Sequence, residues 1–224
     1  MKRCLIISGG YEPHRANETA GRLDDMLRED FDVVHSPRLD AYLTEDLASY
    51  DLIVPNWTLG EMSLEMSRNL RLAVESGVGL GGFHGGMADG FRHSTHFRFI
   101  VGGTYAAEPG GICDYEVKVE DPQDPIMSGL ADFSYRSEQY YMHVDPAVTV
   151  LATTRFSGSP YPWLEGVVMP TVWKKMFGKG RVFFSALGHV PEEFDRAPMH
   201  TLLARGLRWA SRAPLHTAGI NKSI

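Results

Sequence analysis

The chain has 224 residues, of which 43% are hydrophobic and 22% charged, as is ordinary for a globular protein. Its net charge is −6 and its Lys and Arg residues are scattered, so no basic face is available to bind nucleic acid. No apolar stretch approaches the about 18 residues that a membrane span needs, so we expect no membrane partner either.

The first residues predict a buried β-strand rather than a secretion signal. The apolar run that starts at Cys4 ends at Ser8, which is too short for the hydrophobic part of a signal peptide. Two cysteines, Cys4 and Cys113, cannot build a disulfide scaffold. Both features favour a reducing cytoplasm as the location of the protein.

Strands and helices alternate along the first 83 residues. The spacing of Ala20, Leu23 and Leu27 predicts a helix, and Ser63 and Gly77 are typical of the start and end of another. The expected strands cover residues 3–8, 31–34, 51–55 and 78–83, and the expected helices begin at Asn17 and cover 43–50 and 63–75. This alternation predicts an α/β fold with a doubly wound, mostly parallel sheet.

The second half of the chain predicts extra antiparallel strands. They begin at 115–119 and include 148–152 and 167–173; a short helix at 95–101 precedes them, and a strand at 180–185 and a helix at 198–210 follow. No linker divides the sequence, so we expect one domain over residues 1–213. The segment 214–224 has no periodicity and is expected to be a flexible tail.

Polar and aromatic side chains follow several of the predicted parallel strands. His14 follows the first strand, Trp57 the third, His84 the fourth and His189 the last. Ligands of open α/β sheets bind beyond the carboxyl ends of the strands, so these side chains are expected to converge on one rim. The alternative for each histidine is a structural hydrogen bond to nearby backbone.

The segment Gly82-Phe83-His84-Gly85-Gly86 matches the tight strand-to-helix turn that exposes a nucleophile in hydrolases. Its central residue is His84, which excludes acyl transfer by a cysteine or serine at this position. The alternative is a glycine-rich turn in which the histidine has no catalytic role.

A second cluster of polar and aromatic residues covers 137–143. If it is one extended strand, Glu138 and Tyr140 share one face and Tyr141 and His143 share the other. Glu138 with histidines can bind a metal or act as an acid or base; the alternative is a solvated strand edge. His93 and His96, three residues apart on the predicted helix, are expected to be surface residues.

The sequence resembles the ThuA-like (trehalose-utilisation) family over most of its length. The matching segments are 6–10 with His14, 50–54, 75–84, 101–103, 137–141 and 173–189, the last being the most specific. The resemblance implies a flavodoxin-like fold similar to that of class I glutamine amidotransferases. His84 then replaces their cysteine, and His189 looks like the counterpart of their late histidine. Related sequences commonly carry histidine where this chain has Asp124.

Two classes of function follow. In the first, the protein is an enzyme of trehalose or related disaccharide use, with no glutaminase activity. His84 and His189 transfer protons, Glu138 orients a histidine or takes part itself, and a sugar-like ligand contacts the residues His14, Trp57, Tyr140, Tyr141 and His143. A divalent metal held by a subset of His84, Glu138, His143 and His189 is a variant of this hypothesis. In the second, the chain is a non-catalytic sugar-binding or subunit-interaction domain. A homo-oligomer is compatible with both.

Overall fold

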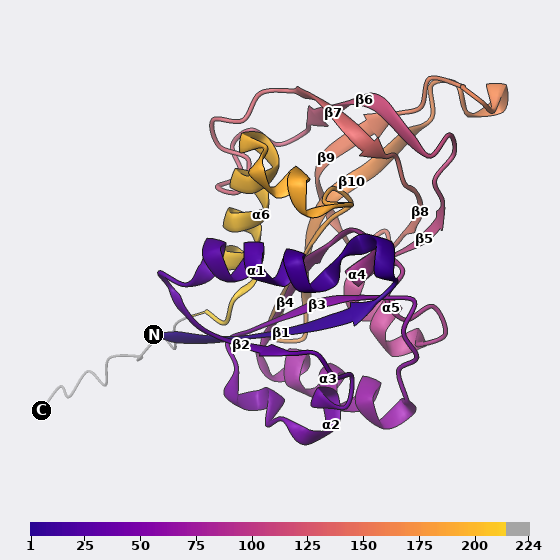
Figure 1. The fold of residues 1–224 in the computed structure, drawn as a ribbon. Coiled ribbons are helices and arrows are strands. Elements are labelled where there is room, and N and C mark those ends of the chain that lie inside the picture. Colours follow the sequence, from indigo (N-terminus) through magenta and orange to yellow (C-terminus); the bar gives the residue numbers. More distant parts are fainter. Residues whose placement is uncertain (214–224) are drawn as a thin grey trace, which may run out of the picture.

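A computed structural model describes residues 1–213 of the chain. Its centre is a nine-stranded sheet in the order β2-β1-β3-β4-β11-β10-β9-β6-β7 (Figure 1). The first five strands of this order are parallel, and the others are antiparallel. The predicted fold class, a mostly parallel α/β sheet with extra antiparallel strands, is therefore confirmed.

The parallel half has the strand order typical of flavodoxin-like folds. Its strands are β1 (Lys2–Gly10), β2 (Phe31–Ser36), β3 (Leu52–Thr58), β4 (Gly79–Phe83) and β11 (Gly180–Ser185). Side chains of β1 alternate between the two faces, with Leu5 and Ile7 in one hydrophobic core and Cys4 and Ile6 in the other. Both faces are covered, as expected for a doubly wound sheet.

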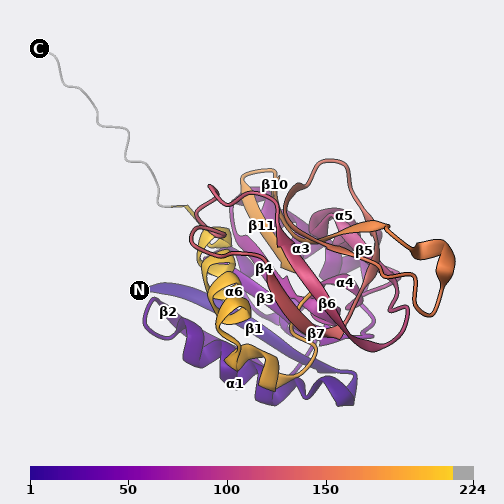
Figure 2. The ribbon, with the colours of Figure 1, turned by 90° about the horizontal axis from the view of Figure 1, so that it is seen from above.

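Helices cover the two faces of this half. One core contains side chains of α1 (Ala16–Leu27) and α6 (Ala197–Ala210), which lie together on one side of the sheet (Figure 2). The other contains side chains of α2 (Ala41–Thr44), α3 (Leu64–Ser76), α4 (His84–Ala88) and α5 (Thr95–Val101). Ser63 caps α3 by accepting the N–H of Met66 at 3.1 Å, and Gly77 ends the helix with a φ of 121°, as expected.

The antiparallel half extends the same sheet and adds a small second one. The extension consists of β10 (Val168–Phe177), β9 (Thr149–Arg155), β6 (Ile112–Val119) and β7 (Phe133–Glu138). The second sheet pairs β5 (Gly103–Ala107) with β8 (Tyr141–Val144). Cys113 lies in β6 and Cys4 is buried in β1; both are free thiols.

Three local expectations are wrong. The helix expected over 43–50 is two short turns, α2 and Leu47–Ser49, because the backbone of Glu45 between them is extended. The third strand does not end at Pro55 but continues to Thr58. Pro55 lies past the last β3–β4 pair, so its missing N–H removes no hydrogen bond on that side. His93 is in a turn before α5, and only His96 is on the helix.

The segment 137–143 is not one extended strand. β7 ends at Glu138 in the large sheet, β8 begins at Tyr141 in the small sheet, and Gln139 and Tyr140 lie between them. Glu138 and Tyr140 nevertheless face the same site, since both contact His84 Nε2, whereas Met142 packs in the hydrophobic core. The expected tail, 214–224, lies outside the described residues.

Candidate functional site

Three histidines from different strand ends meet at the carboxyl edge of the parallel half. His14 ends the turn after β1 (Glu12–His14), His84 directly follows β4, and His189 follows β11. Their ring centroids are 5.0–5.1 Å apart in all three pairs. The convergence follows from the common direction of parallel strands.

The backbone at this edge is conformationally strained. Among residues 1–213, the non-glycine residues with positive φ are Arg15 at 47°, Leu59 at 59° and His84 at 44°. They follow β1, β3 and β4, which places all three around the histidine cluster. Strain of this kind persists where the surrounding structure holds it, commonly at functional sites.

The turn at His84 has the conformation of a nucleophile elbow. Phe83 is extended and His84 is left-handed, and the two following glycines pack against the end of β3. A Cβ on Gly85 would lie 2.7 Å from Thr58 Oγ1, and one on Gly86 would lie 2.6 Å from the Pro55 carbonyl oxygen. Glycine is therefore required for this close approach. In contrast to an exposed nucleophile, His84 is 1% exposed.

Hydrogen bonds determine which nitrogen of His84 carries the proton. Nδ1 lies 3.0 Å from the carbonyl oxygen of Ala186, which can only accept, so Nδ1 is the donor. In the neutral ring, Nε2 is then left with a lone pair. The hydroxyl of Tyr140, 2.8 Å away, donates to that nitrogen.

Glu138 and His189 complete a compact group of ligand atoms around His84 Nε2. His189 Nδ1 lies 3.1 Å from His84 Nε2, and Glu138 Oε2 lies 3.3 Å from each of these nitrogens. The three atoms form a nearly equilateral triangle. His14 adds a fourth, since one ligand atom from each of the four residues lies within 4.8 Å of the others. His14 Nδ1 is also 2.9 Å from Thr58 Oγ1.

The charges of the cluster differ from those of free side chains. Burial, reinforced by the charges of His84 and His189, lowers the pKa of His14 to about 3. Burial would raise the pKa of Glu138, but the hydrogen bond from His189 and the neighbouring His84 reverse that effect and hold the pKa well below its ordinary value. Burial opposes charge on His189, but the hydrogen bond and charge of Glu138 raise its pKa. At neutral pH His14 is therefore uncharged and Glu138 is ionised.

A pocket of about 220 Å³ opens beside the cluster. It is lined by Tyr11, His14, Thr58, Leu59, Asp89, Arg92, Tyr105, Glu108, Glu138 and Tyr140. Asp89 is almost buried and is paired through both carboxylate oxygens with Arg92. The lining is mostly polar, with aromatic rings and carboxylates in reach of one small ligand.

Not every predicted site residue reaches this pocket. Trp57 is half-buried, and its ring packs against Gly9, Gly10 and Gly60. Tyr141 is half-buried and lies against Phe156.

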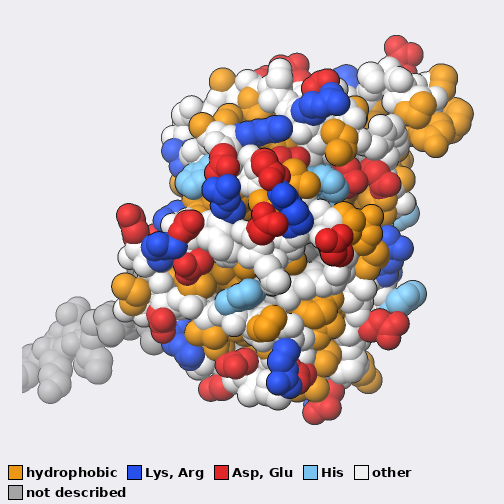
Figure 3. Space-filling view, viewed as in Figure 1, with side chains coloured by type: hydrophobic (Ala, Val, Ile, Leu, Met, Phe, Trp, Pro, Cys, Tyr) orange, Lys and Arg blue, Asp and Glu red, His pale blue; other side chains and the backbone are white. Residues whose placement is uncertain are grey.

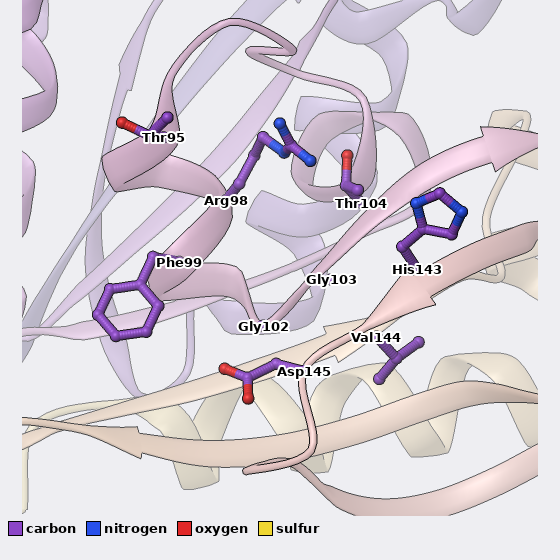
Figure 4. A pocket seen from close by; sticks show the side chains of 9 residues that line it. All are labelled: Thr95, Arg98, Phe99, Gly102, Gly103, Thr104, His143, Val144 and Asp145. Carbon is purple, nitrogen blue, oxygen red and sulfur yellow. The ribbon is translucent and has the colours of Figure 1, made fainter.

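His143 is exposed on β8 and lines a separate pocket of about 370 Å³ (Figure 4). The predicted metal set therefore loses His143 and gains His14, because Glu138 and His143 belong to different sheets.

Several pocket residues were not predicted. Asp89 and Arg92 follow the elbow helix α4 at a spacing of three, which was an available signal. Tyr105 and Glu108 belong to β5 and the loop after it, and no strand was expected there.

Asp124, where related sequences commonly carry histidine, lies away from the pocket. It is buried, pairs with Lys174 and accepts the N–H of Ile126, so its role here is structural.

The fold and the elbow together define an α/β protein of the class I amidotransferase-like type with histidine at the nucleophile position. The model of the ThuA family, described as trehalose utilisation, matches residues 3–210. This chain therefore belongs to the ThuA family, and membership associates it with trehalose utilisation. No curated protein matches the chain.

Solved structures show the same fold at low sequence identity. A putative ThuA-like protein from Bacteroides uniformis is 22% identical, with a TM-score of 0.77 over 93% of this chain and 91% of its own. One from Parabacteroides merdae is 19% identical, with a TM-score of 0.75 over 93% and 89%. A cytoplasmic protein from Salmonella typhimurium is 15% identical, with a TM-score of 0.67 over 94% and 100%.

Within residues 1–213, no helix is long and apolar enough to cross a membrane. On the face shown in Figure 3, basic and acidic side chains are interspersed rather than gathered into one basic patch.

Proposed function

We propose that the chain binds a divalent cation through His14, His84, Glu138 and His189 and uses it to act on a sugar-like, hydroxyl-rich ligand. The observation that carries the proposal is the triangle formed by His84 Nε2, His189 Nδ1 and Glu138 Oε2, with sides of 3.1–3.3 Å. Ligand atoms about 2.0–2.1 Å from a tetrahedral cation lie about 3.3 Å from one another. The triangle thus has the size of one face of a coordination sphere.

Protonation states support the same assignment. A metal ligand needs a lone pair, and the bond from Nδ1 to the Ala186 carbonyl leaves Nε2 of His84 with one. His14 is uncharged at neutral pH because its pKa is about 3. Glu138, whose pKa is well below its ordinary value, supplies the negative charge. Three imidazoles and a carboxylate suit zinc, manganese or a similar transition metal better than calcium.

The neighbouring pocket supports a small polar ligand. Asp89 is neutralised by Arg92, so the wall offers hydrogen-bonding groups without a strong positive charge for a phosphate. Glu108 adds an acceptor, and the rings of Tyr11 and Tyr105 add surfaces on which a sugar ring can stack. The association of the family with trehalose utilisation favours a sugar as this ligand.

In this proposal His84, His189 and Glu138 act on the ligand through the cation. A bound cation polarises a hydroxyl or carbonyl oxygen and lowers the pKa of a bound water. Burial, reinforced by the charge of Glu138, raises the pKa of Tyr140 well above its ordinary value, so its hydroxyl stays protonated. In the metal-free site this hydroxyl donates to His84 Nε2. A cation that took the lone pair of Nε2 would release the hydroxyl of Tyr140 to donate a hydrogen bond to an oxygen of the ligand. A cytoplasmic location belongs to the same proposal and is supported by the two free cysteines.

Metal analysis and ligand panels test the proposal. Purified protein should carry a transition metal, and metal-free protein should melt at a higher temperature when zinc or manganese is added. His84→Ala should lose both effects, whereas His143→Ala is the matched control, since His143 is exposed and outside the cluster. Metal-loaded protein should then convert a member of a panel of trehalose and related disaccharides. Equal metal binding by both variants would reject the cation site. A panel member that binds without turnover would favour the non-catalytic alternative.

A further inference from the structure

We infer that Glu193 is a positioning residue that holds His189 against Glu138 by tying the loop after β11 to the end of β7. The two residues that must meet come from different halves of the sheet. His189 follows the parallel strand β11, whereas Glu138 ends the antiparallel strand β7. No ladder connects these strands, since β10, β9 and β6 lie between them in the sheet order. Their 3.3 Å approach therefore needs another tie.

Glu193 supplies the first part of that tie through the backbone beside His189. It lies in the short helix Pro191–Asp195 and is 3% exposed. Its Oε2 accepts the N–H of Gly188 at 3.1 Å and the N–H of His189 at 3.0 Å. A buried carboxylate is costly without partners, and N–H bonds to a charged acceptor are stronger than bonds to a neutral one. The loop that carries His189 is thus held at the backbone of the histidine itself.

The same oxygen of Glu193 also receives a bond from the other half of the sheet. The hydroxyl of Tyr135, on β7 three residues before Glu138, donates to Oε2 at 2.6 Å. Tyr135 is buried, and the guanidinium of Arg196 lies 5.1 Å from its ring centre. One carboxylate oxygen therefore joins the His189 backbone to the strand that carries Glu138.

The loop is rigid around this joint, so a change at Glu193 is expected to reach His189. Gly188 has a φ of 105°, and a Cβ there would lie 2.8 Å from Met199 Cε. Phe194, next to Glu193, packs edge to face on Phe83 with ring centres 5.0 Å apart. Phe83 directly precedes His84, so the short helix that bears Glu193 is packed against the elbow as well.

This inference rests on the proposed cation site and adds the residue that sets its geometry. Groups behind metal ligands typically contribute 10–100-fold to metal affinity, although they never touch the metal. Losing Glu193 should leave all four ligands in the chain but allow His189 to move from Glu138. The expected loss of affinity is therefore about 10-fold for Glu193→Gln, which keeps an acceptor, and about 100-fold for Glu193→Ala.

Cobalt titration of the metal-free protein provides the test, because the visible spectrum of Co²⁺ reports both affinity and coordination geometry. A third variant, Tyr135→Phe, removes the hydroxyl that bonds to Glu193 but keeps the buried ring. A loss of binding in this variant is therefore not explained by misfolding. Tyr135→Phe should weaken cobalt binding about 10-fold and change the spectrum. The matched control is Glu192→Gln, because Glu192 is exposed and pairs with Arg15 on the surface. Glu192→Gln should bind cobalt with the affinity and the spectrum of the wild-type protein.

The outcomes separate this inference from the proposed function. If Glu193→Gln and Tyr135→Phe lower the melting temperature but leave cobalt affinity and spectrum unchanged, Glu193 is merely structural and the inference is wrong. If the unchanged protein binds no cobalt, zinc or manganese, the cation site itself is wrong. In that case the ¹⁵N chemical shift of His189 Nδ1 in the metal-free protein tests whether Glu193 positions His189. The shift should change in both variants and not in Glu192→Gln; no change would overturn the positioning role.

Discussion

The parallel and antiparallel halves of the sheet contribute to the site in different ways. The parallel half supplies His14, His84 and His189, each within a few residues of a strand end. The antiparallel half supplies Glu138 and Tyr140, at the point where the chain leaves the large sheet for the small one. Strand direction alone brings the first three together. The other two arrive through tertiary packing and ties such as that between Glu193 and Tyr135.

A substitution should therefore disturb the site in different ways in the two halves of the sheet. A parallel sheet buried on both faces keeps its strand ends in place as long as the domain is folded. The contribution of the antiparallel half depends on a few hydrogen bonds that a single substitution removes. Side chains of the antiparallel half should therefore affect binding more than stability, and core side chains of the parallel half should do the reverse.

The largest effect is expected at Glu138, the carboxylate among the four proposed ligands. Glu138→Gln keeps the shape of the side chain but removes its charge, so cation affinity should fall by more than about 100-fold, beyond the range typical of groups behind the ligands. Calorimetric titration with zinc measures it. The melting temperature of the metal-free protein should change far less than in a core variant, and an unchanged zinc affinity would show that Glu138 is not a ligand of the cation.

A core substitution in the parallel half should give the opposite pattern. Phe183 on β11 is fully buried, and its ring lies against Gly206 of α6. Phe183→Ala should lower the free energy of unfolding by about 3–5 kcal/mol because it leaves a cavity. Urea unfolding measures the loss. At a temperature where the variant is folded, its zinc affinity should remain close to that of the wild-type protein. A loss of zinc affinity together with the loss of stability would show that packing in the parallel half also determines binding.

The depressed pKa of His14 predicts how the metal-free protein responds to acid. The pKa of about 3 lies below the 6.5 of a free histidine, so between these values the unfolded chain binds a proton that the folded chain does not. The stability from this group is thus complete above pH 6.5 and decreases as the pH falls towards 3. Melting curves at a series of pH values in a chelator should show this decrease. The melting temperature of His14→Asn should depend less on pH between 3 and 6.5. An equal pH dependence in the variant and the wild-type protein would show that His14 is not the group responsible.

The sequence predicts the parallel half of the sheet better than the antiparallel half. Apolar runs and caps located β1, β4 and β11 and the ends of α3, and strand direction implied that His84 and His189 face one edge. The break at Gln139 was not predictable, because nothing in an alternating polar and aromatic segment distinguishes one strand from two. For that reason His143 was grouped with Glu138, and β5 with Tyr105 was missed. Glu193 was not singled out, because its role depends on backbone N–H groups that no side-chain pattern reveals.

The smallest predicted effect is at a helix end remote from the site. Ser63 accepts the N–H of Met66 and starts α3. Ser63→Ala should lower the free energy of unfolding by about 1 kcal/mol, as is typical for a lost N-cap, without a change in cation binding. Thermal melting measures it, and Ser128→Ala, at an exposed position in a turn, is a suitable control. A several-fold change in zinc affinity in Ser63→Ala would show that the cation site depends on the stability of the whole parallel half.

The most direct measurement is X-ray absorption spectroscopy at the zinc edge of protein loaded with one equivalent of zinc. We expect a first shell of nitrogen and oxygen atoms at about 2.0–2.1 Å from the zinc, with the outer-shell scattering of several imidazoles. His84→Ala should lose part of the imidazole signal or fail to load. A protein that takes up no zinc, or zinc surrounded by oxygen atoms without imidazole scattering, would contradict the claim that these histidines and Glu138 form a metal centre.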